Sequence, residues 1–271
     1  MSLEALLNWP APDRPLPPGQ TVDASSLGRT FIITDTLDRS ASFLLHQFVL
    51  RHLRLPNWVV RLVCISQLPA HYAAVQKKLG IHLTQHKNTF ESIDVFSNLD
   101  TLSSINTIDS SSVASGLTCE NDPTVVLFRQ ISSTVRDQRH PCIVIDDVTM
   151  LLYAGWSVQQ LVKLIMALSG FVVERSGCLV ILTHDDCPDD LELVSFNSWI
   201  VRLANILILV RPLKSGYTDD VHGQLTVRLG PQSLWEPVNA AGQLHTIQEG
   251  EVLFRINDSS VDWLSKGTTV M

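Results

Sequence analysis

No glycine directly precedes a lysine anywhere in the 271 residues of this chain. The phosphate loop of nucleotide-hydrolysing proteins, G-x-x-x-x-G-K-[ST], is therefore absent. The G-x-S-x-G motif of hydrolases and the H-E-x-x-H motif of metalloproteases are missing as well, so neither class has support. No apolar run reaches the roughly 18 residues that a membrane-spanning helix needs, so we expect no membrane partner.

Basic residues are also scarce. The chain has 20 Lys and Arg against 27 Asp and Glu, which gives a net charge of −7. A protein that coats nucleic acid needs a strongly basic surface, so this class is disfavoured, although a local basic patch is still compatible with the composition. Hydrophobic residues make up 45% and charged residues 17%, an ordinary balance for a globular chain.

The cysteines carry no pairing motif. The five are Cys64, Cys119, Cys142, Cys178 and Cys187, and none belongs to a C-x-x-C pair. Cys64, Cys142 and Cys178 lie in or beside apolar runs, which is typical of small buried hydrophobic residues in a reducing compartment. The pattern predicts neither a disulfide framework nor a zinc site, and it favours a cytoplasmic or nuclear location.

Two histidines have a spacing that a metal site could use. His82 and His86 are four residues apart, so on a helix they would share one face. Gly80 precedes them and is expected to end a helix, and no third ligand is near in the sequence. A surface pair of histidines is the preferred interpretation, and no metal ligand is assigned.

The chain divides into a short lead-in and one domain. Residues 1–28 contain "WPAPDRPLPPG", in which five prolines favour an extended segment, and 29–271 is predicted to be a single domain. Within that domain, a Ser-rich stretch around 98–123 has no periodicity and is expected to be a long loop.

Apolar runs alternate with helical patterns along this domain. Strands are expected at 29–36, 58–66, 141–145, 177–186 and 204–213, and helices at 40–55, 69–80, 124–139 and 157–177. Strands that are apolar throughout, with helices between them, predict an α/β fold with a mostly parallel sheet covered on both faces. Residues 220–229 and 245–257 alternate instead, which predicts a C-terminal antiparallel hairpin region.

The position of a phosphate loop, between the first strand and the first helix, is occupied by "TDTLDRSAS" (34–42). This stretch has no glycine to turn backbone amides inward and no lysine to neutralise phosphate. Asp35 and Asp38 would repel a polyphosphate, and only Arg39 supplies a positive charge.

The strand "PCIVIDD" ends on two adjacent carboxylates, Asp146 and Asp147. One interpretation is a metal-binding strand end of the Walker B kind. The other is that these side chains accept amide hydrogen bonds at the rim of the sheet. Because the phosphate loop is absent, the structural role is favoured.

The order of elements, the degenerate loop and "IVIDD" together look like the RecA-type ATPase core. Three stretches, "HYAAVQKKLGI", "IVIDDVTMLLYAG" and "DVHGQLTVRL", resemble the family of the sixth subunit of the Elongator complex. The resemblance extends from about Arg29 to Phe254, which is most of the chain.

The resemblance implies a RecA-like fold that has lost its phosphate-binding signature. It implies a hetero-hexameric ring with the fourth and fifth Elongator subunits, docked on the remaining subunits, that binds and releases tRNA during wobble-uridine modification. This chain would then be a pseudo-ATPase subunit without catalytic residues and without a cofactor of its own. Any ATP would be bound at subunit boundaries, and any turnover would belong to the assembled ring.

An acidic subunit that touches tRNA needs a focused basic spot, since phosphate contacts dominate affinity. Arg202, Arg211 and Lys214, near the ends of the later strands, are candidates, and solvated surface charges are the alternative. The stretch from Thr183 to Asp186 also ends a strand. It is interpreted as a polar loop at the sheet rim rather than a ligand sensor.

Two rival functions remain open. The first is an ATPase that uses Asp146 or Asp147 with an irregular phosphate cradle completed by a neighbouring subunit. The second is a recombinase-like accessory protein that binds DNA. The net negative charge and the lack of a basic stripe disfavour the second, so no DNA partner is expected.

Overall fold

The structure is a computed structural model of the chain. It describes residues 2–7, 9, 26–99, 122–133, 135, 139–213, 216, 218, 220–235 and 247–264. Most of the proline-rich stretch and most of the Ser-rich segment around 98–123 lie outside the described residues.

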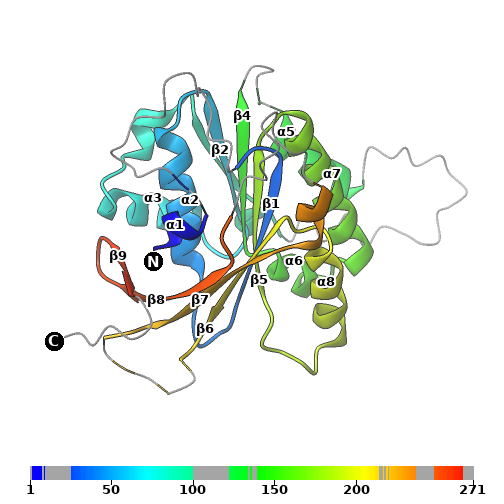
Figure 1. The fold of residues 1–271 in the computed structure, drawn as a ribbon. Helices are drawn as coiled ribbons and strands as arrows, with labels where there is room; N and C mark the ends of the chain where they lie inside the picture. The colour runs from blue at the N-terminus through cyan, green and yellow to red at the C-terminus, as the bar shows by residue number, and fades with distance from the viewer. Residues whose placement is uncertain are drawn as a thin grey trace, which may run out of the picture.

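A nine-stranded sheet forms the centre of the fold, in the order β3-β2-β4-β5-β1-β6-β7-β8-β9 (Figure 1). Strands β1 to β6 pair in parallel and β7 to β9 continue the sheet antiparallel. The strands are β1 (Arg29–Asp35), β2 (Trp58–Cys64), β3 (Phe90–Asp94), β4 (His140–Asp146), β5 (Cys178–His184), β6 (Ile206–Arg211), β7 (Gly223–Leu229), β8 (Gly250–Ile256) and β9 (Val261–Leu264). The expected α/β sheet with an antiparallel C-terminal region is confirmed.

Helices cover both faces of the parallel half, as Figure 1 shows. On one face lie α1 (Leu3–Leu6), α2 (Ser42–Arg54) and α3 (Pro69–Lys78). On the other lie α5 (Pro123–Ser132), α6 (Thr149–Tyr153), α7 (Val158–Glu174) and α8 (Leu191–Val201). Each face has its own cluster of buried apolar side chains, so the sheet separates two hydrophobic cores.

Local sequence signals account for several element ends. Helix α7 begins with a capping box, with Ser157 accepting from the Gln160 amide and the Gln160 side chain accepting from the Ser157 amide. After α3 the chain turns at Gly80, whose φ of 83° lies in the left-handed region that glycine tolerates best. Asp122 accepts the Thr124 amide at the start of α5.

Several elements differ from the sequence-based expectation. Strands β3 and β9 and helices α1, α6 and α8 were not predicted, and α5 ends at Ser132 rather than near residue 139. Strand β3 reads "FESID" and lies at the sheet edge, so it lacks the apolar run on which the prediction relied. The acidic stretch before α8 was interpreted as part of a loop, and the helix that follows it was not predicted.

The first residues belong to the core. Helix α1 buries Leu3 and Leu6, and Leu7 is buried behind it in the cluster that also contains α2. Ser2 caps this turn by accepting from the Ala5 amide. The lead-in is therefore anchored at its beginning, which the proline content of 1–28 did not indicate. No helix in the described ranges is long and apolar enough to cross a membrane.

Candidate functional site

Polar side chains end three strands that are neighbours in the sheet. Asp35 ends β1, Asp146 ends β4 with Asp147 directly after it, and His184 ends β5. These strands run parallel in the order β4-β5-β1, so their carboxyl ends meet at one edge. Ligands of open α/β sheets bind at this edge, which makes it the candidate nucleotide position.

His184 bridges two of the carboxylates. Its Nδ1 contacts Asp35 Oδ1, and its Nε2 lies 2.9 Å from Asp147 Oδ2. The Asp35 and Asp147 side chains are buried, and the imidazole is 23% exposed. Hydrogen bonds to Asp147 and then Asp35 raise the pKa of His184 to about 10, against a lowering by burial. At neutral pH the side chain is therefore an imidazolium between two carboxylates.

The remaining oxygens of this group have protein partners. Asp35 Oδ2 accepts the Ala41 amide at 2.7 Å, and Asp147 Oδ1 accepts the Thr149 amide at 3.0 Å. The two aspartates thereby fix the starts of the segments that lead into α2 and α6.

Asp146 is held separately, by the phenol of Tyr72 on α3, whose hydroxyl donates to Asp146 Oδ2. Burial raises the pKa of Asp146 to about 6, while the Tyr72 hydrogen bond acts in the opposite direction. The backbone carbonyl of Asp146 accepts from the Ile65 and Ser66 amides at the end of β2. The two adjacent aspartates therefore contact different layers of the fold.

The connection from β1 to α2 makes internal hydrogen bonds. Carboxylates accept two of its amides, since Leu37 donates to Asp186 Oδ2 at 2.7 Å and Ala41 donates to Asp35. The amides of Thr36 and Arg39 donate to each other's carbonyl groups across a tight turn. A phosphate loop needs such amides turned towards the ligand, whereas here protein oxygens accept them.

Arg39 lines a groove of about 470 Å³ next to this connection, together with His46, His71 and His222. Its guanidinium donates to the carbonyl of Asp38. Burial, with a contribution from His71, lowers the pKa of His46 to about 4, so His46 is neutral at physiological pH.

The three candidate RNA-contacting residues have different surroundings. Arg211 contacts the Asp185 carboxylate and donates to Thr34, which ties its guanidinium to the ends of β1 and β5. Arg202 is exposed and lies over the ring of Trp199, 5.4 Å from its centroid. Lys214 lies outside the described residues.

The histidine pair of the sequence analysis lies at η1 (Leu83–His86), with His82 just before it. Within the described part of the chain, the group of side chains with metal-ligand geometry contains neither of these histidines.

Asp146 and Asp147 were identified from the sequence as candidates, but their side-chain partners, Tyr72 and His184, were not predicted. His184 was interpreted only as part of a polar loop, and Tyr72 was not considered. One signal was available, because polar residues end three apolar strands that a parallel sheet brings to one edge. The strand order decides which of them touch, and a single sequence does not give it.

Comparison with solved structures agrees with this architecture. A KaiC-like protein from the hyperthermophilic archaeon Pyrococcus horikoshii superposes with a TM-score of 0.57 at 10% identity, over 88% of this chain and 90% of that one. At this identity the likeness shows the fold alone, and the predicted RecA-like fold is confirmed.

Sequence relatives cover nearly the whole chain. Elongator complex protein 6 of Danio rerio is 27% identical over 252 residues, which span 88% of this chain and 91% of the relative. The Homo sapiens protein of the same name is 24% identical over 259 residues, with 91% and 94% covered. The family model described as Elongation complex protein 6 matches residues 19–246. The chain therefore belongs to the Elongation complex protein 6 family.

Proposed function

We propose that this chain is a non-catalytic RecA-like subunit of the Elongator complex. It assembles with the fourth and fifth subunits into a hetero-hexameric ring that binds and releases tRNA during wobble-uridine modification. The observation that carries the proposal is membership of the Elongation complex protein 6 family over 19–246, together with a phosphate-loop position whose amides bind protein carboxylates.

The non-catalytic role is supported by the partners of the carboxylates. A metal-binding strand end needs carboxylate oxygens turned towards a cation. Here Asp147 contacts the His184 imidazolium and the Thr149 amide, and Asp146 accepts from Tyr72. The imidazolium supplies the positive charge that a metal ion would otherwise bring to Asp35 and Asp147.

Assembly is supported by helix α8, which is apolar on more than one side. Leu193, Phe196 and Ile200 are buried beneath it, while Leu191 is 79% and Trp199 51% exposed. A helix that is apolar all round is normally covered. Beside it, a groove of about 540 Å³ is lined by Val194, Val201, Leu207 and Leu209, among others. The occupant of this surface is a neighbouring RecA-like subunit of the ring.

Contact with tRNA is proposed along the same groove beside α8. Arg202 lines the α8 groove, and Arg211 is paired with Asp185 in its wall. Because Arg211 already neutralises the Asp185 carboxylate, Arg202 is the stronger candidate for a phosphate contact. Lys214 is proposed as a phosphate contact on the sequence alone.

Native mass spectrometry of the full chain, purified gently from its own cells, tests the assembly. We expect a hexamer of three related subunits for the wild type. In the Leu191→Ser/Val194→Ser variant we expect the hexamer fraction to fall at least tenfold, because the apolar contact between α8 and the neighbouring subunit is lost. The fold of the chain should not change, since both side chains are exposed in the isolated chain. Met166→Ser makes the same kind of change, from an exposed apolar residue to serine, on α7. It is the matched control and should leave the hexamer fraction unchanged.

A stable monomer, or a complex with unrelated proteins, would contradict the ring. A hexamer that forms equally well with Leu191→Ser/Val194→Ser would keep the ring but remove α8 from its interfaces. Circular dichroism of each variant separates lost assembly from lost folding.

The ATPase alternative makes a separate prediction. We expect Asp146→Asn and Asp147→Asn, alone or combined, to leave ATP turnover per assembled ring within about twofold of wild type. A metal-holding carboxylate would instead lower turnover by orders of magnitude. Turnover is measured on rings whose intact mass has been verified, so a tenfold loss in such rings would revive the enzyme interpretation.

A further inference from the structure

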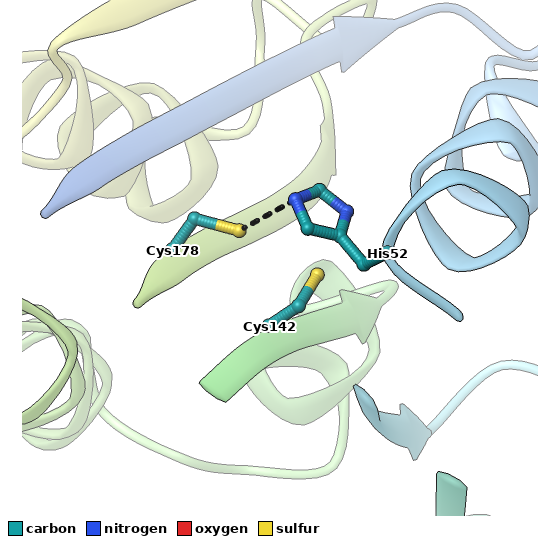
Figure 2. A group of neighbouring side chains, drawn as sticks. All are labelled: His52, Cys142 and Cys178. Atoms are coloured by element: carbon teal, nitrogen blue, oxygen red, sulfur yellow. Dashed lines mark hydrogen bonds between the residues drawn. The ribbon is translucent and has the colours of Figure 1, made fainter. Parts of the chain in front are cut away.

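Three side chains with ligating atoms meet inside the core on the α2 side of the sheet. His52 comes from α2, Cys142 from β4 and Cys178 from β5, as Figure 2 shows. Their ligand atoms all lie within 4.8 Å of one another, and all three residues are fully buried. Cys142 and Cys178 are register partners on adjacent parallel strands, so their side chains project to the same face.

The orientation of the imidazole is fixed by its other nitrogen. His52 Nδ1 lies 2.8 Å from the carbonyl oxygen of Phe48, one turn earlier in α2. A carbonyl only accepts, so Nδ1 carries the proton and Nε2 presents its lone pair to the sulfurs. Phe48 stacks on the ring with an interplanar angle of 4°, and Trp58 packs against it at 4.5 Å between centroids. A metal-bound histidine typically has this second-nitrogen hydrogen bond to a backbone carbonyl.

The spacing of the ligand atoms fits a shared ion. Cys178 Sγ lies 3.6 Å from His52 Nε2, the contact drawn as a dashed line in Figure 2. Metal–sulfur and metal–nitrogen bonds of about 2.3 and 2.05 Å at a tetrahedral angle place the two ligand atoms about 3.6 Å apart. A thiol that donates to Nε2 would give a similar distance, so the presence of an ion has to be measured.

Charge also fits. Two thiolates and a neutral imidazole neutralise a divalent ion, so no net charge would be left in the apolar core. With a monovalent ion the group would keep one negative charge. Thiolate and imidazole are the ligands that soft d10 ions prefer.

We propose that His52, Cys142 and Cys178 bind one thiophilic d10 metal ion, zinc(II) or copper(I), as a structural site that ties α2 to β4 and β5. Binding forms two metal–sulfur bonds and one metal–nitrogen bond and releases both thiol protons to solvent. Three protein ligands match the low coordination number that copper(I) tolerates, whereas charge neutrality favours zinc(II).

Burial has a kinetic consequence. Because the three residues are inaccessible in the folded chain, the ion enters as the chain folds and leaves only when it opens. Chelators added to the folded protein should therefore release the ion slowly, and denaturant should release it at once.

The experiment measures metal content of the full chain, purified from its own cells without chelators. Elemental analysis is expected to give about one zinc or copper per chain, and native mass spectrometry a mass increased by one ion minus the displaced protons. With a colorimetric chelator we expect less than a tenth of the ion to be released in an hour, and complete release in guanidinium. Elemental analysis distinguishes zinc from copper.

Substitutions locate the ion. Cys142→Ala and Cys178→Ala are expected to lower the metal content at least tenfold, whereas Cys64→Ala, another buried cysteine, should retain it. The wild-type mass and elemental measurements test the proposal even if the alanine variants fold poorly. A wild-type chain with less than a tenth of an equivalent of either metal, or equal metal in wild type and a folded Cys178→Ala variant, overturns it.

Discussion

Replacing His184 by alanine is expected to lower the free energy of unfolding by roughly 3 kcal/mol at pH 7, because it leaves two buried carboxylates without their shared counter-charge. Asp35 and Asp147 both contact this imidazole. Denaturant unfolding of the full chain measures the change. His82→Ala, at an exposed position, is the matched control and should have little effect.

The effect should depend on pH in a defined direction. The pKa of His184 rises from 6.5 to about 10 on folding, so its contribution is fully present below pH 6.5 and is lost as the pH rises through about 10. The difference between wild type and His184→Ala should therefore be largest near pH 6 and shrink towards pH 10.5. Titration of Asp146, whose pKa is raised by burial to about 6, occurs in both proteins and largely cancels in the difference.

A second substitution tests the charge argument itself. In the His184→Ala variant, the carboxylates of Asp35 and Asp147 face the space that the imidazole occupied. Adding Asp35→Asn removes one of these two like charges, so part of the lost free energy of unfolding should return. If His184→Ala costs less than about 0.5 kcal/mol, or if its cost does not change between pH 6 and 10.5, the imidazolium is not the counter-charge of this site.

The predicted and observed folds agree where the hydrophobic pattern is long. Strands β1, β2 and β4 were identified because burial on both faces of a parallel sheet requires continuous apolar runs. Helix α2 was identified from the helical spacing of its apolar residues. Edge strands are exempt from that requirement. Strand β3, which reads "FESID" and has neither an apolar run nor regular alternation, therefore gave no signal.

The candidate site was predictable in composition but not in pairing. Asp146 and Asp147 were recognised because they end an apolar strand, whereas Asp35 was noted only as a repelling charge at the phosphate-loop position. The side-chain partners of these three aspartates lie between 37 and 149 residues away in the chain. His184 is 149 residues from Asp35, and Tyr72 is 74 residues from Asp146. The group of His52, Cys142 and Cys178 was invisible for the same reason, because tertiary packing and not a spacing motif brings its atoms together.

Trp9→Ala is the second substitution with a large expected cost, about 3 kcal/mol in free energy of unfolding. Trp9 is buried to 7% exposure, packs edge-on against Phe48 at 4.9 Å between centroids, and lies under the guanidinium of Arg51 at 4.5 Å. The Leu6 carbonyl nearby accepts from the Gln248 amide, which ties the N-terminus to the C-terminal part of the chain. Chemical unfolding of the full chain measures the loss.

Trp9→Phe sharpens this test. The indole Nε1 of Trp9 is buried and finds no acceptor among the described residues, so phenylalanine removes an unpaired donor while keeping the aromatic contact with Phe48. We expect Trp9→Phe to cost less than half as much as Trp9→Ala. Trp199→Ala, at a half-exposed tryptophan of α8, should cost the isolated chain less than about 1 kcal/mol. Equal costs for Trp9→Ala and Trp199→Ala would mean that Trp9 does not contribute to the stability of the core. The interpretation that the first nine residues anchor the lead-in would then be wrong.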